Sequence, residues 1–313
     1  MEIAIETKKL HKVYDGGHIA LKGIDLSIPL GSFYGLLGPN GAGKTTTIGI
    51  LTGLVNITSG TASIMGYDSV REFRKARRLV GLSPQELNFD VFFSMEELLE
   101  LQAGYYGLQK KEAKKRAELM LEQFGLIDKR KSKARELSGG MKRRMQIAKA
   151  LVHDPPIVIL DEPTAGVDIE LRHMLWEYLK KINKEGKTIL LTTHYIEEAE
   201  KLCESVSIIN DGNIIATDSP EELTKAHGMS GLEIILSSKV DDFYLENFKF
   251  KKFDDKVHVH TKYPERDMAL IINEIMDKGG EIANVCIYKS SLEDVFMKLT
   301  GKSLLESQVF KDE

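Results

Sequence analysis

Five side chains that could carry out phosphate chemistry lie at three places in this chain of 313 residues. Lys44 and Thr45 end a glycine-rich stretch, whereas Asp161, Glu162 and His194 follow apolar runs. A lysine binds phosphate oxygens, threonine and aspartate oxygens suit Mg²⁺, and a glutamate can deprotonate an attacking water. The set therefore predicts a site that binds and hydrolyses a nucleotide.

The glycine-rich stretch has the context that a phosphate-binding loop requires. A predicted strand at 34–37 leads into it, and an apolar-periodic segment at 48–54 follows it. Glycine lets successive backbone N–H groups face inward, and the helix N-terminus adds its positive end. A glycine-rich turn with a chance lysine is the alternative, which this full pattern disfavours. The residues expected at the phosphates are Gly38, Pro39, Asn40, Gly41, Ala42, Gly43, Lys44, Thr45 and Thr46.

The later polar residues are expected at the ends of buried strands. Residues 157–160 are all apolar and deliver Asp161 and Glu162, and the run 187–193 leads to His194. Because the ends of parallel strands meet at one edge of a sheet, these side chains should lie together. Asp161 is expected to hold Mg²⁺ through water, and Glu162 to activate the attacking water. His194 can hydrogen-bond a γ-phosphate, although a lone histidine is more often structural.

Two further residues are candidates for the same site. Gln85 ends a predicted buried strand at 79–85, where its amide can contact a metal-bound water. Tyr14 lies in a turn between two segments of alternating apolar residues, and its ring could stack on adenine. A surface glutamine and a core tyrosine are the structural alternatives, so both assignments depend on the other motifs.

A second anion site is predicted in a helical part of the chain. Residues 90–152 have helical periodicity and interrupt an otherwise α/β pattern, which indicates an inserted helical subdomain. Within it, Ser138, Gly139, Gly140 and Met141 precede or open a helix. A hydroxyl, bare N–H groups and a helix N-terminus can bind an anion. Since one chain needs one phosphate grip, we infer that two copies face each other; a serine cap with flexible glycines is the alternative.

Composition restricts the class of protein. The net charge of −4 argues against a dedicated nucleic-acid binder. No apolar run approaches the ~18 residues that span a bilayer, and the acidic, alternating start at 1–6 is unlike a signal peptide. Cys203 and Cys286 lie far apart without metal-type spacing, which suits a reducing cytoplasm, and both are interpreted as small buried residues.

The length allows about two domains. Residues 1–227 are predicted to form an α/β domain that contains the helical subdomain at about 90–152. A glycine-containing segment at 228–231 resembles a linker, and residues 228–313 are predicted to form a small α+β domain.

Taken together, the motifs resemble those of ABC-type ATPases over roughly residues 2–226. The stretch 38–45 resembles the Walker A loop, 157–161 the Walker B strand, and 137–141 the signature sequence of that family. Single residues match its Q-loop, D-loop, switch histidine and adenine-stacking aromatic, namely Gln85, Asp168, His194 and Tyr14. Met141 stands where the family usually has glutamine, so the resemblance implies a contact of Ser138 and the backbone here and not of that glutamine side chain.

This resemblance implies a fold and a cycle. The expected fold is an α/β P-loop NTPase (ABC ATPase) core with an antiparallel β subdomain and an inserted helical subdomain. ATP and Mg²⁺ are the expected cofactors, with Thr45, Gln85 and Asp161 at the metal, partly through water. Two ATP molecules would lie between two copies in a head-to-tail dimer, which Ser138 and the D-loop residue Asp168 help to form.

A closer resemblance is to ATP-binding subunits of ABC-2 type exporters, the drug and polysaccharide export group. The stretches 165–168 and 292–301 carry it, together with the loop at 38–46. It implies a separately encoded membrane permease, a homodimer or heterodimer of ATP-binding subunits, no nucleic acid, and a place on the inner face of the cell membrane. A soluble ABC ATPase acting on ribosomes or nucleic acid, and a regulatory nucleotide-binding protein without a transport role, are the alternatives.

Overall fold

The computed structural model describes residues 2–228, 230–237, 245, 247–253, 255–261, 263–288 and 290–301. These residues group into two compact units, which divide between Ser219 and Pro220. Helix α8 (Pro220–His227) groups with the second unit. The domain boundary after residue 227 stays a prediction.

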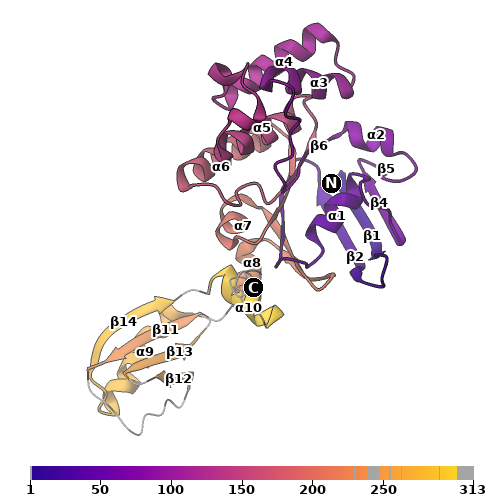
Figure 1. Cartoon of the computed structure of the whole chain (residues 1–313). Helices are drawn as coiled ribbons and strands as arrows, with labels where there is room; N and C mark the ends of the chain where they lie inside the picture. The colour runs from indigo at the N-terminus through magenta and orange to yellow at the C-terminus, as the bar shows by residue number, and fades with distance from the viewer. Residues whose placement is uncertain are drawn as a thin grey trace. The chain divides into compact units, whose positions relative to one another are not determined.

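A six-stranded sheet in the order β10-β9-β3-β8-β7-β6 forms the centre of the first unit (Figure 1). Its neighbouring strands are parallel except for the antiparallel pair β9 and β10. Strands β3, β7 and β8 are buried along their whole length, as the continuous apolar runs predict. The strands are β3 (Phe33–Leu37), β6 (Val80–Ser83), β7 (Ile157–Asp161), β8 (Thr188–Thr193), β9 (Ser205–Asn210) and β10 (Asn213–Asp218).

A second, antiparallel sheet has the order β2-β1-β4-β5. Helix α1 (Lys44–Leu51) contacts β4 of this sheet and β7 of the central sheet. Because α1 touches both sheets, Ile48, Ile50 and Leu51 are all buried in a core that the two sheets share. The strands are β1 (Ile3–Val13), β2 (Ile19–Pro29), β4 (Ser59–Ile64) and β5 (Tyr67–Asp68).

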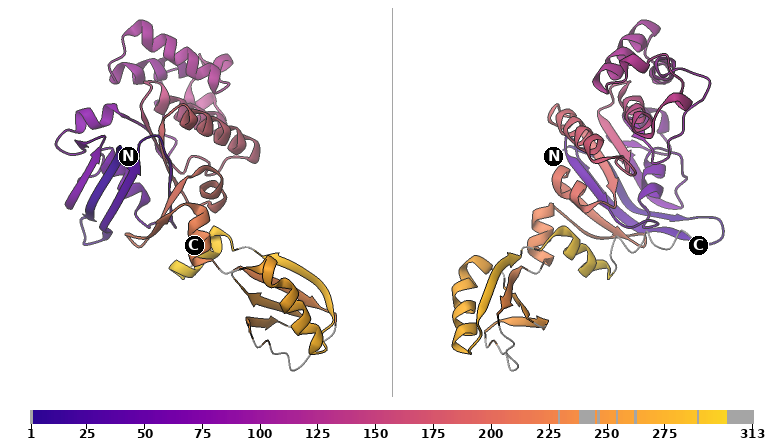
Figure 2. Two further views of the ribbon diagram at one scale, coloured as in Figure 1. Left: turned by 180° about the vertical axis from the view of Figure 1, so that it is seen from behind. Right: turned by 60° about the vertical axis from the view of Figure 1, so that its left-hand side comes forward.

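Helices α3, α4 and α5 gather at one end of the first unit, in agreement with an inserted helical subdomain (Figures 1 and 2). A capping box starts α3: Ser94 Oγ accepts from the backbone of Glu97, and the Glu97 carboxylate accepts from the backbone of Ser94. Ser138 caps α5, since its Oγ accepts from the backbone N–H of Met141. The helices are α3 (Met95–Tyr105), α4 (Lys110–Gln123) and α5 (Gly139–Leu151).

Three other helices complete the first unit. Asp168 caps α6, whose buried Leu171, Leu175 and Leu179 form one apolar face. Helix α7 follows β8 and contacts both β3 and β8. The helices are α2 (Phe73–Arg78), α6 (Ile169–Lys184) and α7 (Ile196–Leu202). No helix in the described part of the chain is both long and apolar enough to cross a membrane.

The second unit is built on an antiparallel sheet in the order β12-β13-β11-β14. Helix α9 buries Ile271 and Ile275 in a core with the sheet. Cys203 is buried, but the interpretation of Cys286 as a buried residue is wrong: it is exposed on β14, an edge strand. The elements are β11 (Gly231–Leu236), β12 (Lys249–Phe253), β13 (Lys256–His260), α9 (Pro264–Asp277), β14 (Ile282–Tyr288) and α10 (Leu292–Thr300).

Candidate functional site

The loop between β3 and α1 needs glycine at two positions for reasons of packing. A Cβ at Gly38 would lie 2.2 Å from the carbonyl oxygen of Ile209, and one at Gly43 would lie 2.8 Å from that of Ala20. Gly43 also has a φ of 112°, which residues with a side chain rarely adopt. Strands β9 and β2 therefore impose glycine here, in addition to the space that a phosphate needs.

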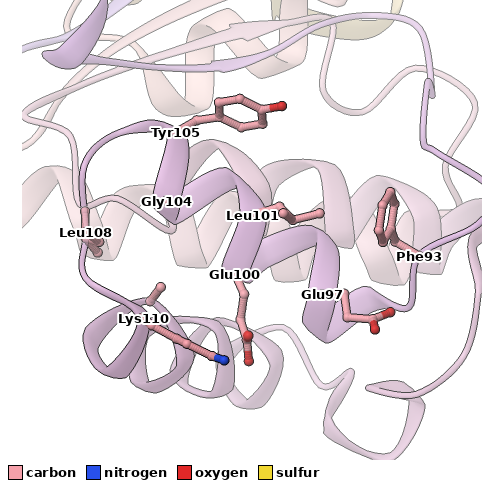
Figure 3. A pocket seen from close by; sticks show the side chains of 9 residues that line it. Phe93, Glu97, Glu100, Leu101, Gly104, Tyr105, Leu108 and Lys110 are labelled. Atoms are coloured by element: carbon pink, nitrogen blue, oxygen red, sulfur yellow. The ribbon is translucent and has the colours of Figure 1, made fainter.

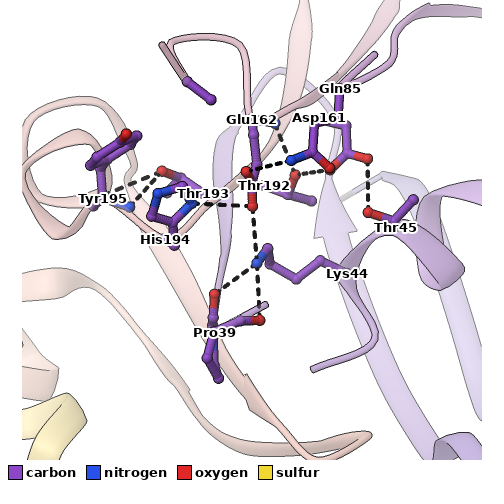
Figure 4. Close-up of polar contacts among 12 residues, drawn as sticks. Pro39, Lys44, Thr45, Gln85, Asp161, Glu162, Thr192, Thr193, His194 and Tyr195 are labelled. Atoms are coloured by element: carbon purple, nitrogen blue, oxygen red, sulfur yellow. Dashed lines mark hydrogen bonds and ion pairs between the residues drawn. The ribbon is translucent and has the colours of Figure 1, made fainter. Parts of the chain in front are cut away.

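Lys44 places its ammonium at the centre of the site (Figure 4). Its Nζ donates to the carbonyl oxygens of Gly38 at 2.7 Å and Pro39 at 3.1 Å, and lies 3.2 Å from Glu162 Oε1. The side chain is only 4% exposed, and burial lowers the pKa of Lys44, while the Glu162 carboxylate opposes that shift. This ammonium can exchange loop carbonyls for the oxygens of a phosphate.

The Asp161 carboxylate lies between two threonine hydroxyls. Its Oδ2 accepts from Thr45 Oγ1 at 3.0 Å, and its Oδ1 accepts from Thr192 Oγ1. Burial raises the pKa of Asp161, although both hydroxyls oppose the shift. Thr192 Oγ1 also accepts from the backbone N–H of Glu162 at 3.2 Å. Sequence reasoning missed Thr192, whose one signal is its position on the strand that leads to His194.

The donors around Asp161 fit Mg²⁺. Carboxylate, hydroxyl and amide oxygens are the ligands this small, hard cation takes, with waters completing its shell. Thr45 and Asp161 already place two such oxygens 3.0 Å apart. The part of the chain that the structure describes has no group of three or more His, Cys, Asp or Glu residues that could hold a metal. Thr45 and Asp161 would hold such a cation together with oxygens of phosphate and water.

The Glu162 carboxylate receives contacts from three predicted site residues (Figure 4). Its Oε2 accepts from Gln85 Nε2 at 3.0 Å, and its Oε1 lies 3.2 Å from both His194 Nδ1 and Lys44 Nζ. Burial alone would raise the pKa of Glu162, but His194 and Lys44 together lower it. This carboxyl group is therefore held ionised, as a base that accepts a proton must be.

The backbone of Glu162 is strained. Its φ is 49°, in the left-handed region that a residue with a long side chain rarely adopts. Such strain persists only where surrounding contacts hold it, and here the Glu162 N–H donates to the carbonyl oxygen of Thr192 at 3.1 Å. The turn after β7 thus directs the carboxylate back toward Lys44 instead of along the strand.

Lys44, Thr45, Gln85 and Glu162 line a cavity of about 310 Å³, whereas Asp161 and His194 contact these residues without lining it. Tyr14 lies at its edge, with its hydroxyl 3.2 Å from Thr46 Oγ1. His18 also lines it and is stacked with Tyr14 at a ring distance of 6.5 Å. Sequence reasoning missed His18, because no motif marks it. The lining residues are Tyr14, His18, Ala20, Asn40, Gly41, Gly43, Lys44, Thr45, Thr46, Gln85 and Glu162.

The predicted signature and D-loop residues do not line this cavity. Ser138 Oγ accepts from the backbone of Met141 at 3.3 Å, and Asp168 Oδ1 accepts from that of Leu171 at 2.8 Å. Ser138, Gly139 and Asp168 are exposed. A Cβ at Gly140 would lie 2.9 Å from a Leu171 side-chain carbon, so α5 and α6 meet here. Their contact with the nucleotide of a second copy stays a prediction.

Comparison with known proteins gives matches along nearly the whole chain. The sequence profile of the family described as ABC transporter matches residues 21–165. Nod factor export ATP-binding protein I of Cupriavidus metallidurans is 36% identical over 304 residues, covering 97% of this chain and 99% of that protein. Linearmycin resistance ATP-binding protein LnrL of Bacillus subtilis is 34% identical over 309 residues, covering 96% of this chain and 99% of that protein. The likeness therefore includes the second unit.

Solved structures match the larger part of the chain. One described as the ATP-binding subunit of an ABC transporter has a TM-score of 0.67 and 32% identity, over 72% of this chain and 93% of that one. A dimeric ATP-binding cassette in a post-hydrolysis state, bound to ADP and Pi, has a TM-score of 0.64 and 30% identity, over 69% of this chain and 98% of that one.

Proposed function

Because this chain belongs to the family of ATP-binding proteins of ABC transporters, we propose that it powers export of a substrate through a separately encoded ABC-2 type permease. The chain is an ATPase by family, and two relatives that match almost its whole length are named for export and for resistance. These names favour export over an action on ribosomes or nucleic acid. The observation that carries the chemistry is the convergence of Lys44, Gln85 and His194 on the carboxylate of Glu162.

Each residue of the site has a role in this proposal. The loop at 38–46 and Lys44 bind the phosphates of ATP, and Tyr14 stacks on the adenine. Glu162 accepts the proton of the attacking water, and His194 orients that water and the γ-phosphate. When bound, Mg²⁺ neutralises charge on the phosphates; Thr45, Gln85 and Asp161 would hold it, partly through water.

The active form in this proposal is a head-to-tail dimer of ATP-binding subunits. Ser138 and Gly139 are exposed at the N-terminus of α5, where a second anion can be bound without competing with the cavity of the same chain. The exposed Asp168 lies nearby at the start of α6. A solved relative that is similar over 98% of its length is dimeric. Each copy would therefore complete the ATP site of the other.

We place the permease on the helical subdomain. A cavity of about 770 Å³ lies along α3 and the start of α4, where Leu101 and Tyr105 are exposed (Figure 3). Tyr105 also lines a neighbouring cavity with Arg74, Arg77 and Arg78. Glu97, Glu100 and Lys110 also line the first cavity, so this surface suits an amphipathic permease segment that carries charges of both signs. Binding there would attach the protein to the inner face of the membrane.

A pull-down from detergent-solubilised membranes of the host tests the proposed function. The bait is the Glu162→Gln protein with ATP, and the control is the same bait without nucleotide. Recovery of a polytopic permease supports the proposal, whereas recovery of ribosomes or nucleic acid contradicts it and favours the alternative. A Leu101→Glu bait should lose the permease and keep the ATPase rate of the isolated subunit, while Leu119→Glu, an exposed change on α4 outside the cavity, should keep both.

A further inference from the structure

The segment that carries Gln85 has little structure of its own. It begins where β6 ends, and residues 84–90 form neither helix nor strand and are mostly exposed. Gln85 nevertheless donates to the carboxylate of Glu162 at 3.0 Å. Something outside the segment must hold it for that contact to have a defined geometry.

Helix α5 supplies those contacts through two buried side chains. Arg143 Nη1 donates to the carbonyl oxygen of Gln85 at 3.2 Å and, more weakly, to that of Pro84 at 3.5 Å. Gln146 Nε2 donates to the carbonyl oxygen of Glu86 at 2.6 Å. The carbonyl oxygens of three successive residues, Pro84, Gln85 and Glu86, thus accept hydrogen bonds from side chains of α5.

The two side chains also support each other. Arg143 Nη1 donates to Gln146 Oε1 at 3.0 Å, and both residues are at most 5% exposed. Arg143 Nη2 lies 3.5 Å from the carbonyl oxygen of Ala165, which belongs to the loop that follows Glu162. A buried guanidinium that meets several carbonyls in fixed directions is rigid, because its planar fork allows few other arrangements.

We propose that Arg143, together with Gln146, is a positioning residue that fixes the backbone of Gln85 against helix α5 and thereby sets the contact between the Gln85 side chain and Glu162. This inference rests on the proposed roles of Gln85 and Glu162. Arg143 therefore acts on the catalytic carboxylate through the backbone of Gln85, and not by contacting Glu162 itself.

The first test compares Arg143→Met with Arg144→Met in steady-state ATP hydrolysis by the full-length chain. Arg144 is a matched control, since it lies on the same helix and donates to the carbonyl oxygen of Phe124 at 2.9 Å, within the helical subdomain. Arg143→Met is expected to lower kcat about tenfold with KM for ATP changed less than about twofold, because its contacts act on Glu162 and not on the phosphate loop. Arg144→Met is expected to leave kcat within about twofold.

Thermal unfolding of both variants separates positioning from loss of stability. If Arg143→Met does not fold, Arg143→Lys replaces it, because a lysine keeps the charge but cannot bond Gln85, Gln146 and Ala165 together. Equal losses of kcat in Arg143→Met and Arg144→Met, or a loss that appears only in KM, would overturn the inference.

A double-mutant cycle with Gln85→Ala gives the sharper test. If Arg143 acts through Gln85, adding Arg143→Met to Gln85→Ala should lower kcat by less than about twofold more. If the fold-losses of kcat in the two single variants multiply in the double variant, this inference is overturned and the proposed function stays intact. If Gln85→Ala alone keeps the wild-type kcat, both the role of Gln85 and the inference are refuted.

Discussion

The buried carboxyl group of Glu198 accepts two hydrogen bonds, from which the loss of stability in a Glu198 variant can be calculated. Its Oε1 accepts from Thr164 Oγ1 at 2.8 Å and from Trp176 Nε1 at 3.1 Å, and all three side chains are buried. Helix α7 carries Glu198 and follows His194, while Thr164 follows Glu162. The carboxyl group therefore connects the two loops that hold the catalytic pair.

Glu198→Ala is expected to be strongly destabilising, because it leaves two buried donors without an acceptor. At about 1 to 3 kcal/mol for each of the two orphaned groups, the loss of unfolding free energy should be about 2 to 6 kcal/mol. For a unit of this size, at about 2 to 4 °C for each kcal/mol, the melting temperature should fall by about 4 to 24 °C. Glu198→Gln keeps an acceptor oxygen in the same place, so its loss should be about 1 kcal/mol or less.

The assay is thermal unfolding of the full-length protein followed by the fluorescence of Trp176, the only tryptophan of the chain. Because this indole bonds to Glu198, its emission reports directly on the site of the change. Losses for Glu198→Ala and Glu198→Gln that agree within about 1 kcal/mol would refute the reasoning, since the buried hydrogen bonds would then contribute nothing measurable.

The pH dependence of stability checks the same group independently. Burial raises the pKa of Glu198 above its ordinary 4.5, and its Oε2 has no hydrogen-bond partner among the described residues. As pH rises past 4.5 the unfolded chain loses this proton first, so the native state binds more protons and its stability falls. The wild type should therefore lose stability relative to Glu198→Gln between pH 4.5 and neutral, and a pH-independent difference would contradict this.

Three further predictions concern other parts of the first unit. Lys44→Ala should weaken ATP binding about 100-fold in a fluorescent-nucleotide titration, because one charge-assisted phosphate contact is lost; unchanged affinity would exclude Lys44 from the site. Ser138→Ala in the Glu162→Gln background should cost about 1 kcal/mol of stability but abolish the ATP-dependent dimer in light scattering, and a dimer that persists would contradict its role. Burial lowers the pKa of His153 from 6.5 to about 4, so stability should fall as pH drops through this range. His153→Phe, which keeps the stack on Tyr106, should reduce that fall, and an unchanged pH profile would rule out His153 as its source.

The general rule that parallel strands end at one edge of a sheet was sufficient to predict most of the site. Two apolar runs predict two buried parallel strands, so the rule predicts that Asp161 and His194, at their ends, lie close together. The glycine-rich motif before α1 predicts that Lys44 and Thr45 bind phosphate and metal. The structure brings Lys44, Gln85 and His194 to Glu162.

Residues that act through long-range packing could not be predicted in the same way. Gly38 is required by Ile209, and Arg143 meets Ala165, across distances in sequence that no local pattern reveals. In the sequence, Thr192 is one of several residues of a buried strand, and only the structure shows that its hydroxyl donates to the carboxylate of Asp161. Strand β12 (Lys249–Phe253) could not be predicted from apolar alternation, because three of its five residues are lysines.

The measurement that tests the central claim most directly is the mass of the Glu162→Gln protein in solution with ATP and Mg²⁺, by light scattering. If Glu162 activates the attacking water and two copies enclose the nucleotides, the variant should bind ATP, hydrolyse it at a small fraction of the wild-type rate, and form a dimer with twice the mass of the 35.1 kDa chain. The protein without nucleotide should remain a monomer. A variant that stays monomeric with ATP and hydrolyses it at the wild-type rate would contradict the account.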